Sequence, residues 1–121
     1  MIIDDYYARL DGAEPLTGLE LVESDVEFLI ALPGNEVRGA GREALRDYVA
    51  ARPAVGRRHH VLRRSADEDL EMVYGVITEG DGRGTGFFSS VALISPDKRL
   101  ARYQSFFHPG FGMFPLPGGA A

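Results

Sequence analysis

The chain has 121 residues, of which 45% are hydrophobic, so it is long enough for one domain with one core. Its formal charge of -5 argues against nucleic acid or an anionic membrane surface as a partner, because phosphate groups are bound by an excess of Lys and Arg. The absence of cysteine excludes a disulfide framework and a cysteine metal site. The start of the chain is acidic rather than signal-like, and no apolar run is long enough for a membrane span, so we expect a cytoplasmic protein.

The first quarter of the chain is expected to hold two helices and a strand. Apolar and aromatic residues recur every three or four positions over residues 2–10, which predicts an amphipathic helix. A second, short helix is predicted over 14–23, with Pro15 in its first turn. Over 25–32 the period changes to two, which predicts a strand that presents one apolar face: Val26, Phe28, Ile30 and Leu32.

A third helix is predicted over 41–52, and four strands follow it. The strands are expected over 57–65, 70–79, 85–94 and 100–108, and their short polar links predict an antiparallel meander. Gly75 and Gly86, inside two of these strands, are candidate bulge points that let a long sheet bend. The tail after residue 109 is predicted to be irregular, with three large side chains that could cap an apolar opening: Phe111, Met113 and Phe114.

This order of elements predicts an α+β domain over residues 1–109, followed by a Gly/Pro-rich tail over 110–121. Helices that cover one face of a bent sheet leave a cone between the two layers. The inside of such a cone can be too wide for side chains to fill, so we expect a mainly apolar pocket with a few polar groups.

Four stretches occur in an order typical of a known superfamily: YYARLD at 6–11, DVEF at 25–28, GREAL at 41–45 and YQSFFHP at 103–109. With them, the chain resembles the SnoaL-like group of the nuclear transport factor 2-like superfamily. The resemblance implies a cone-shaped fold in which three N-terminal helices pack against a strongly curved, mainly antiparallel sheet. It also implies a deep cavity and a homodimer through the outer face of the sheet. Members include ketosteroid isomerases, epoxide hydrolases, polyketide cyclases and binding domains without activity, so the fold alone assigns no reaction.

The resemblance to the enzyme members is incomplete at their reacting residues. Tyr6 matches the oxyanion-donating tyrosine of ketosteroid isomerases, but their two acids correspond to Ile30 and Ser90. Without a carboxylate base, that proton abstraction is not supported. For the Asp-Arg-Asp set of epoxide hydrolases, the last-strand acid corresponds to Ser105, while Ile77 and Glu79 stand where Arg and Asp are expected.

His59 and His60 are the most suggestive pair for catalysis, because imidazole titrates near neutrality. Neighbours on a strand point to opposite faces, so only one of the two can enter the cavity, and they cannot readily share a metal ion. The other interpretation is structural, with one histidine on the outer face and the other hydrogen-bonded near the rim. His108 is a candidate proton-transfer group at the pocket mouth or a solvated strand end.

Hydroxyl and basic residues complete the candidate set. Tyr6, Tyr74 and Tyr103 could donate hydrogen bonds to a ligand carbonyl or belong to the core. Ser90 and Ser105 could be ligand donors or small residues that permit close packing. Four arginines in the first strand of the meander are expected to pair with Glu68, Asp69 and Glu71 across the sheet: Arg57, Arg58, Arg63 and Arg64.

The leading hypothesis is a pocket for a small apolar or aromatic molecule, with no metal and no cofactor. If the protein catalyses, its residues could support proton transfer by histidine, as in a cyclase-like or isomerase-like step. The alternatives are ligand binding without turnover and a dimerisation domain with a filled interior, joined through outward Phe87 and Phe106. The predicted catalytic residues are His59, His60, Tyr6 and His108, and the predicted ligand contacts are Phe28, Ile30, Leu32, Tyr74, Phe88, Ser90, Tyr103, Ser105 and Phe107.

Overall fold

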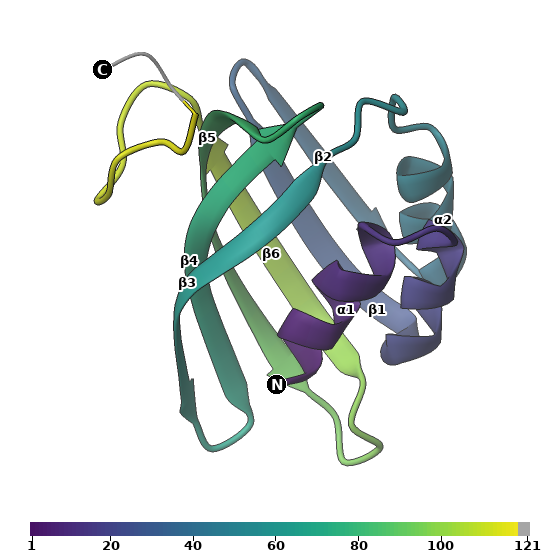
Figure 1. Cartoon of the computed structure of the whole chain (residues 1–121). Coiled ribbons are helices and arrows are strands. Elements are labelled where there is room, and N and C mark those ends of the chain that lie inside the picture. The colour runs from purple at the N-terminus through teal and green to yellow at the C-terminus, as the bar shows by residue number, and fades with distance from the viewer. Residues whose placement is uncertain (119–121) are drawn as a thin grey trace.

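Residues 1–118, which the computed structural model describes, form three helices and one six-stranded sheet (Figure 1). The helices are α1 (Ile2–Leu10), the 3-10 helix η1 (Pro15–Leu21) and α2 (Arg42–Ala50). The strands are β1 (Val22–Leu32), β2 (Asn35–Ala40), β3 (Arg58–Asp67), β4 (Leu70–Glu79), β5 (Arg83–Ile94) and β6 (Leu100–His108). The predicted α+β class is therefore confirmed. The last residues of the predicted tail, 119–121, lie outside the described part of the chain.

The sheet has the order β2-β1-β6-β5-β4-β3 and is mostly antiparallel. The meander predicted for the last four strands is confirmed, because β3, β4, β5 and β6 pair antiparallel in sequence order. β1 lies beside β6 and runs parallel to it. Figure 1 shows α1 and α2 over one face of the curved sheet, which defines an inner face toward the helices and an outer face away from them.

The predicted short second helix is present but ends earlier than expected, and one strand lies where no element was predicted. The second helix is a 3-10 helix that ends at Leu21, and Val22 already has extended backbone angles of -119° and 136°. The segment after Pro33-Gly34 forms the edge strand β2, which pairs with β1 from Leu32↔Asn35 to Glu27↔Ala40. β2 has no buried residue, so its sequence lacks the apolar alternation that signals a strand.

The predicted bend points at Gly75 and Gly86 are confirmed. The pairing of β3 with β4 shifts register between Val61 and Arg63, opposite Gly75, and the pairing of β4 with β5 shifts next to Gly86. A Cβ on Gly75 would lie 2.1 Å from the carbonyl oxygen of His60 and 2.7 Å from the ring of Phe88. Glycine therefore lets the strand and an aromatic ring approach closely where the sheet bends.

α1 is held by burial of one face and by a carboxylate at its start. Ile3, Tyr6, Tyr7 and Leu10, spaced by three and four positions, are all buried. The backbone N–H groups of Ile2 and Ile3 donate to Glu71 on β4, at 3.2 and 2.9 Å. A carboxylate at a helix N-terminus satisfies free donors and complements the helix dipole. This fixes the α1 residues over the inner face of the sheet.

The tail folds back over the outer face instead of capping an opening. The ring of Phe114 lies 6.1 Å from that of Tyr74, whose hydroxyl accepts a hydrogen bond from the Met113 backbone at 2.9 Å. Phe87 is only 6% exposed, because Gly112 lies on its ring. Phe87 is therefore not the outward aromatic that we expected, whereas Phe106 remains 43% exposed.

The arginines of β3 and Arg57, which precedes it, pair differently from the prediction. Arg57 lies 3.4 Å from Glu79 and Arg64 lies 2.7 Å from Asp4. The guanidinium of Arg63 stacks 4.7 Å over the ring of Phe114. Glu71, one of the expected partners, instead binds the start of α1.

Within residues 1–118, none of the helices has the length and apolar character needed to cross a membrane.

Candidate functional site

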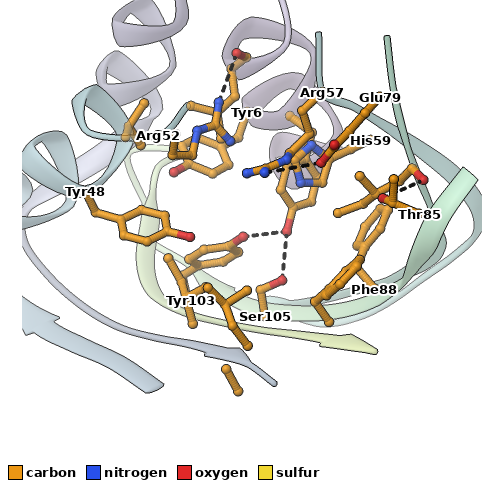
Figure 2. Close-up of a pocket in the computed structure, with 18 residues that line it drawn as sticks. Tyr6, Tyr48, Arg52, Arg57, His59, Glu79, Thr85, Phe88, Tyr103 and Ser105 are labelled. Atoms are coloured by element: carbon orange, nitrogen blue, oxygen red, sulfur yellow. Dashed lines mark hydrogen bonds and ion pairs between the residues drawn. The ribbon is translucent and has the colours of Figure 1, made fainter. Parts of the chain in front are cut away.

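A cavity of about 300 Å³ lies between the helices and the inner face of the sheet. Its walls are mainly aliphatic and aromatic, with a minority of hydroxyl, imidazole and charged groups, which is the usual make-up of a small-molecule site. Figure 2 shows the lining side chains. They are Tyr6, Tyr7, Leu10, Ile30, Ala31, Leu32, Tyr48, Val49, Arg52, Arg57, His59, Ile77, Glu79, Thr85, Phe88, Tyr103, Ser105 and Phe107.

His59 lines this cavity and is bound to Asp11, the residue that ends α1. The Nδ1 atom of His59 lies 3.0 and 3.1 Å from the two carboxylate oxygens of Asp11, whose carboxylate also accepts the backbone N–H of His59. A carboxylate only accepts, so Nδ1 carries the proton and Nε2 keeps its lone pair. Within residues 1–118, Nε2 makes no hydrogen bond to protein.

The environment of His59 keeps its ring neutral and fixed. Burial lowers the pKa of His59 below its ordinary value of 6.5, although the hydrogen bond to Asp11 acts in the opposite direction. The ring stacks on Tyr7 at a centroid distance of 4.1 Å and meets the edge of Phe88 at 5.1 Å. His59 is therefore a neutral imidazole in a fixed orientation, as a general base requires.

Four hydroxyl groups form a second polar feature, which we call the hydroxyl cluster: Tyr7, Ser90, Tyr103 and Ser105. The hydroxyl oxygen of Tyr7 lies 2.6 Å from that of Ser90 and 2.5 Å from that of Tyr103. Ser90 donates to Ser105 at 2.9 Å. Burial raises the pKa of both Tyr7 and Tyr103, so both tyrosines stay protonated at neutral pH.

The hydroxyl cluster has a proton to spare. Each of its four hydroxyls carries one proton, and three bonds of 2.9 Å or less use three of them. Because Ser90 donates to Ser105, Tyr7 must donate to Ser90 and Tyr103 to Tyr7, and the proton of Ser105 is left for a ligand oxygen. Because Tyr7, Tyr103 and Ser105 line the cavity, the hydroxyl cluster can donate to a carbonyl oxygen bound there.

Charged side chains also reach the cavity. Arg57 and Glu79 form an ion pair with each other at 3.4 Å, which Figure 2 shows as a dashed line. Arg52 follows the end of α2 and donates one long hydrogen bond, 3.4 Å, to the carbonyl of Leu10. Among residues 1–118, no three His, Cys, Asp or Glu side chains are grouped as a metal site.

Comparison with known proteins decides the fold. No family model matches the chain, and no curated protein does. Three solved structures illustrate the likeness. A proposed ketosteroid isomerase from Kribbella flavida has a TM-score of 0.74 and 21% identity over 94% of this chain and 80% of its own. A proposed SnoaL-like isomerase from Agrobacterium tumefaciens has a TM-score of 0.75 and 14% identity over 88% of this chain and 94% of its own. A proposed polyketide cyclase from Sinorhizobium meliloti has a TM-score of 0.64 and 23% identity over 86% and 92%.

This is the nuclear transport factor 2-like fold. The likeness to SnoaL-like and isomerase-like proteins that the sequence pattern indicated is thus confirmed at the level of structure. All three identities are below 25%, so the likeness concerns the nuclear transport factor 2-like fold and carries no activity to this chain.

The fold brings only some of the predicted catalytic residues together. Tyr6 and His59 line the cavity, and the hydroxyl of Tyr6 makes no hydrogen bond within residues 1–118. His60 is exposed on the outer face, where its Nε2 lies 2.8 Å from the hydroxyl oxygen of Thr78. His108 is exposed, and its Nδ1 accepts the backbone N–H groups of Gly110 and Phe111. The expectation that His60 or His108 reaches the cavity is therefore corrected.

Most predicted ligand contacts do line the cavity: Ile30, Leu32, Phe88, Tyr103, Ser105 and Phe107. Ser90 is fully buried beneath the wall and acts through the hydroxyl cluster. Phe28 does not line this cavity, because its ring packs in the core against Gly39. Tyr74 lies on the outer face and stacks on Phe87. The placement of Phe28 and Tyr74 in the cavity wall is wrong.

Sequence reasoning missed several groups that define the site. The sequence identifies Asp11 only as the residue that ends a helix. The signal that could have found it is its position, because a carboxylate just after an amphipathic helix can reach a neighbouring strand. Tyr7 belongs to the apolar face of α1, and periodicity alone does not separate its role from that of Tyr6. Arg52 and Tyr48 carry no motif, because their position depends on how α2 crosses the sheet.

Proposed function

We propose that the protein is a cofactor-free enzyme that moves a proton on a small apolar or aromatic carbonyl compound. The observation that carries the proposal is the pairing, in one cavity, of a neutral His59 oriented by Asp11 with a protonated hydroxyl cluster. A base with a free lone pair and a donor for a developing oxyanion are the two groups that removal of a proton next to a carbonyl requires.

In the proposed reaction, the substrate carbonyl accepts a hydrogen bond from the hydroxyl cluster. Nε2 of His59 removes a proton from the neighbouring carbon, and the C–H electrons move to the carbonyl oxygen to give an enolate. The positive charge that forms on the imidazole is stabilised by Asp11. His59 then returns the proton to another carbon, which isomerises the substrate. Alternatively, the enolate carbon attacks a second carbonyl of the same molecule and closes a ring, and the alkoxide formed there takes the proton from His59.

The similar structures support this class of reaction without deciding it. One is a proposed ketosteroid isomerase and another a proposed polyketide cyclase. In this chain, the strand position that resembles the isomerase base holds Ile30, and the base is proposed to come instead from His59 on β3. Ser90, at the position that resembles the isomerase acid, bonds the hydroxyl of Tyr7, the neighbour of the tyrosine that resembles the isomerase donor.

Deuterium exchange tests the function while the substrate is still unidentified. A panel of aromatic and alicyclic ketones is incubated with the protein in D₂O, and incorporation next to the carbonyl is followed by NMR. We expect His59→Ala to lower the exchange rate of any active ketone by about 10²-fold or more. Ser105→Ala is expected to lower it by about 10²-fold, because the one hydroxyl proton that the cluster leaves for an oxyanion is lost.

His60→Ala is the matched control, because this neighbouring histidine lies on the outer face. It should leave the exchange rate unchanged. If His59→Ala exchanges as fast as the wild type, His59 is not the base. Binding of panel members without exchange would favour the alternative of ligand binding without turnover.

We further propose a homodimer and a cytoplasmic protein. Support for the homodimer comes from exposed apolar side chains at one end of the sheet and in the tail, namely Phe106, Phe111 and Met113, which are 43%, 70% and 62% exposed. These three residues line one apolar surface groove. We also propose a cone-shaped interior, which the curved sheet and the helices over it support.

A further inference from the structure

Arg52 is a cation at the cavity wall that the protein itself leaves without an anionic partner. Within residues 1–118, no carboxylate lies within ion-pair distance of its guanidinium, and its Nε atom is buried without any hydrogen-bond partner. Of its five N–H groups, one donates, at 3.4 Å, to the carbonyl of Leu10. Figure 2 shows this as the single dashed line that leaves the guanidinium.

The other inward arginines are satisfied. Arg57 pairs with Glu79 at 3.4 Å, so these two charges cancel in the cavity wall. Arg42 gives two hydrogen bonds, of 3.0 and 2.7 Å, to the carbonyl of Val22. Asp11, the acid beneath the wall, already accepts from the ring and the backbone of His59. The charged groups that line the cavity, Arg52, Arg57 and Glu79, therefore sum to one positive charge.

A partly buried guanidinium with unused donors costs free energy unless a partner satisfies it. An anionic oxygen group on a ligand would supply that partner, and two carboxylate oxygens match the fork of a guanidinium. A carboxylate fits better than a phosphate, because a doubly charged phosphate would need further donors and Arg57 is occupied by Glu79. The rest of the cavity is apolar and suits the body of such a ligand.

We propose that the ligand of this cavity is a small carboxylic acid whose carboxylate is bound by Arg52 and whose apolar body extends toward the hydroxyl cluster. The inference deepens the proposed function, because it assigns the substrate to the carbonyl-bearing acids. It depends on the cavity and on Arg52, and not on whether His59 removes a proton.

Matched acid and amide probes test the inference. Benzoate, 4-acetylbenzoate and 4-phenylbutanoate are compared with their primary amides by calorimetry, with phenyl phosphate as a further probe. We expect at least one acid to bind about 10-fold to 100-fold more tightly than its amide, because one hydrogen bond changes from a neutral to a charged partner. Arg52→Met should abolish this preference, and Arg52→Lys should retain part of it.

Arg46→Met is the matched control, because it removes the same charge from an exposed position of α2 outside the cavity. It should keep the preference for the acid. If Arg52→Met fails to fold, the side-chain Nε–H resonance of Arg52 in the wild type provides the readout and should shift with the acid but not with the amide.

Three outcomes overturn the inference: acid and amide bind equally, no acid binds, or Arg52→Met keeps the preference. Tighter binding of phenyl phosphate than of every acid would assign the site to phosphates and also overturn it. A different result would overturn the proposed function alone. In that result, the wild type and His59→Ala both bind the acid more tightly than the amide, but no ketone in the deuterium panel exchanges.

Discussion

Two opposed effects act on the protonation of His59. Burial among Tyr7 and Phe88 disfavours the charged ring, whereas the carboxylate of Asp11 favours it, and burial has the larger effect on the pKa. The same carboxylate selects the tautomer by accepting the Nδ1 proton. A solvated histidine would be partly protonated near neutrality, so the packing of this residue is what makes it a base at neutral pH.

The lowered pKa of His59 predicts how stability depends on pH. Between the folded pKa and the ordinary value of 6.5, the unfolded chain binds a proton that the folded chain does not. The contribution of His59 to the free energy of unfolding is therefore fully present above about pH 6.5. As the pH falls below this value, the contribution is lost by up to ~1.4 kcal/mol per pH unit until the folded pKa is reached. Urea unfolding at several pH values between 5 and 8 measures this loss.

An NMR titration identifies the group responsible. The chemical shift of the Cε1 proton of His59 should report a pKa below 6.5 for the imidazole ring in the wild type. In Asp11→Asn the pKa should fall further, because the charge that raises it is removed. A His59 that titrates above 6.5 in the folded protein would contradict the assignment of a neutral base.

At the scale of elements, strand register decides which side chains meet. His59 pairs with Ile77, and both line the cavity, whereas His60 pairs with Val76 and points to the outer face because neighbours on a strand alternate. The tail forms a further layer over that outer face. It is anchored by the 2.8 Å hydrogen bond from Gly84 to Pro117 and by the contact of Gly112 with Phe87.

Gly112→Ala tests the packing of the tail. A Cβ at this position would lie 2.2 Å from the ring of Phe87, so the tail must move off the ring. We expect a loss of about 1–3 kcal/mol in the free energy of unfolding, as for other overpacked sites. Urea denaturation gives the value.

Gly110→Ala is the control in the same segment. Its nearest neighbour would be the Cε1 atom of His108, 3.2 Å away, and this exposed side chain can move. Equal stability of the two variants would mean that the tail does not depend on close contact with Phe87.

At the scale of the whole molecule, the two faces of the sheet contact different parts of the chain. The inner face and the helices enclose the cavity, whereas the outer face carries the tail and the exposed ring of Phe106. Because the tail covers Phe87, a partner subunit can contact less of the outer face than a bare sheet would offer. The proposed homodimer must therefore use Phe106 together with the tail residues Phe111 and Met113.

Sedimentation velocity tests this interface. We expect the wild type to sediment as a dimer at micromolar concentration and Phe106→Asp to shift it toward monomer, because a charge would be buried without a partner. Leu16→Asp, which changes a similarly exposed leucine on η1, should leave the dimer intact. A wild type that stays monomeric at high micromolar concentration would contradict the proposal.

The sequence by itself determined the elements whose apolar patterns are strong. The 3.6-residue period of α1, the alternation in β1 and the polar links of the meander are local properties, and each was found in the predicted place. Gly75 and Gly86 were identified as bend points for the same reason, because a glycine inside a strand is a local signal. The edge strand β2 was missed because it has no buried residue and only one large apolar side chain, Val37, packs against the core.

Only the tertiary structure decided the composition of the site. Asp11 and His59 are 48 positions apart, and Tyr7 and Tyr103 are 96 apart, so no local pattern relates them. Their contacts follow from where α1 sits on the sheet and from the register of β3 and β6, which are set by packing over the whole inner face. Periodicity can show that a residue faces inward, but which inward residues contact one another depends on the three-dimensional packing of all the elements.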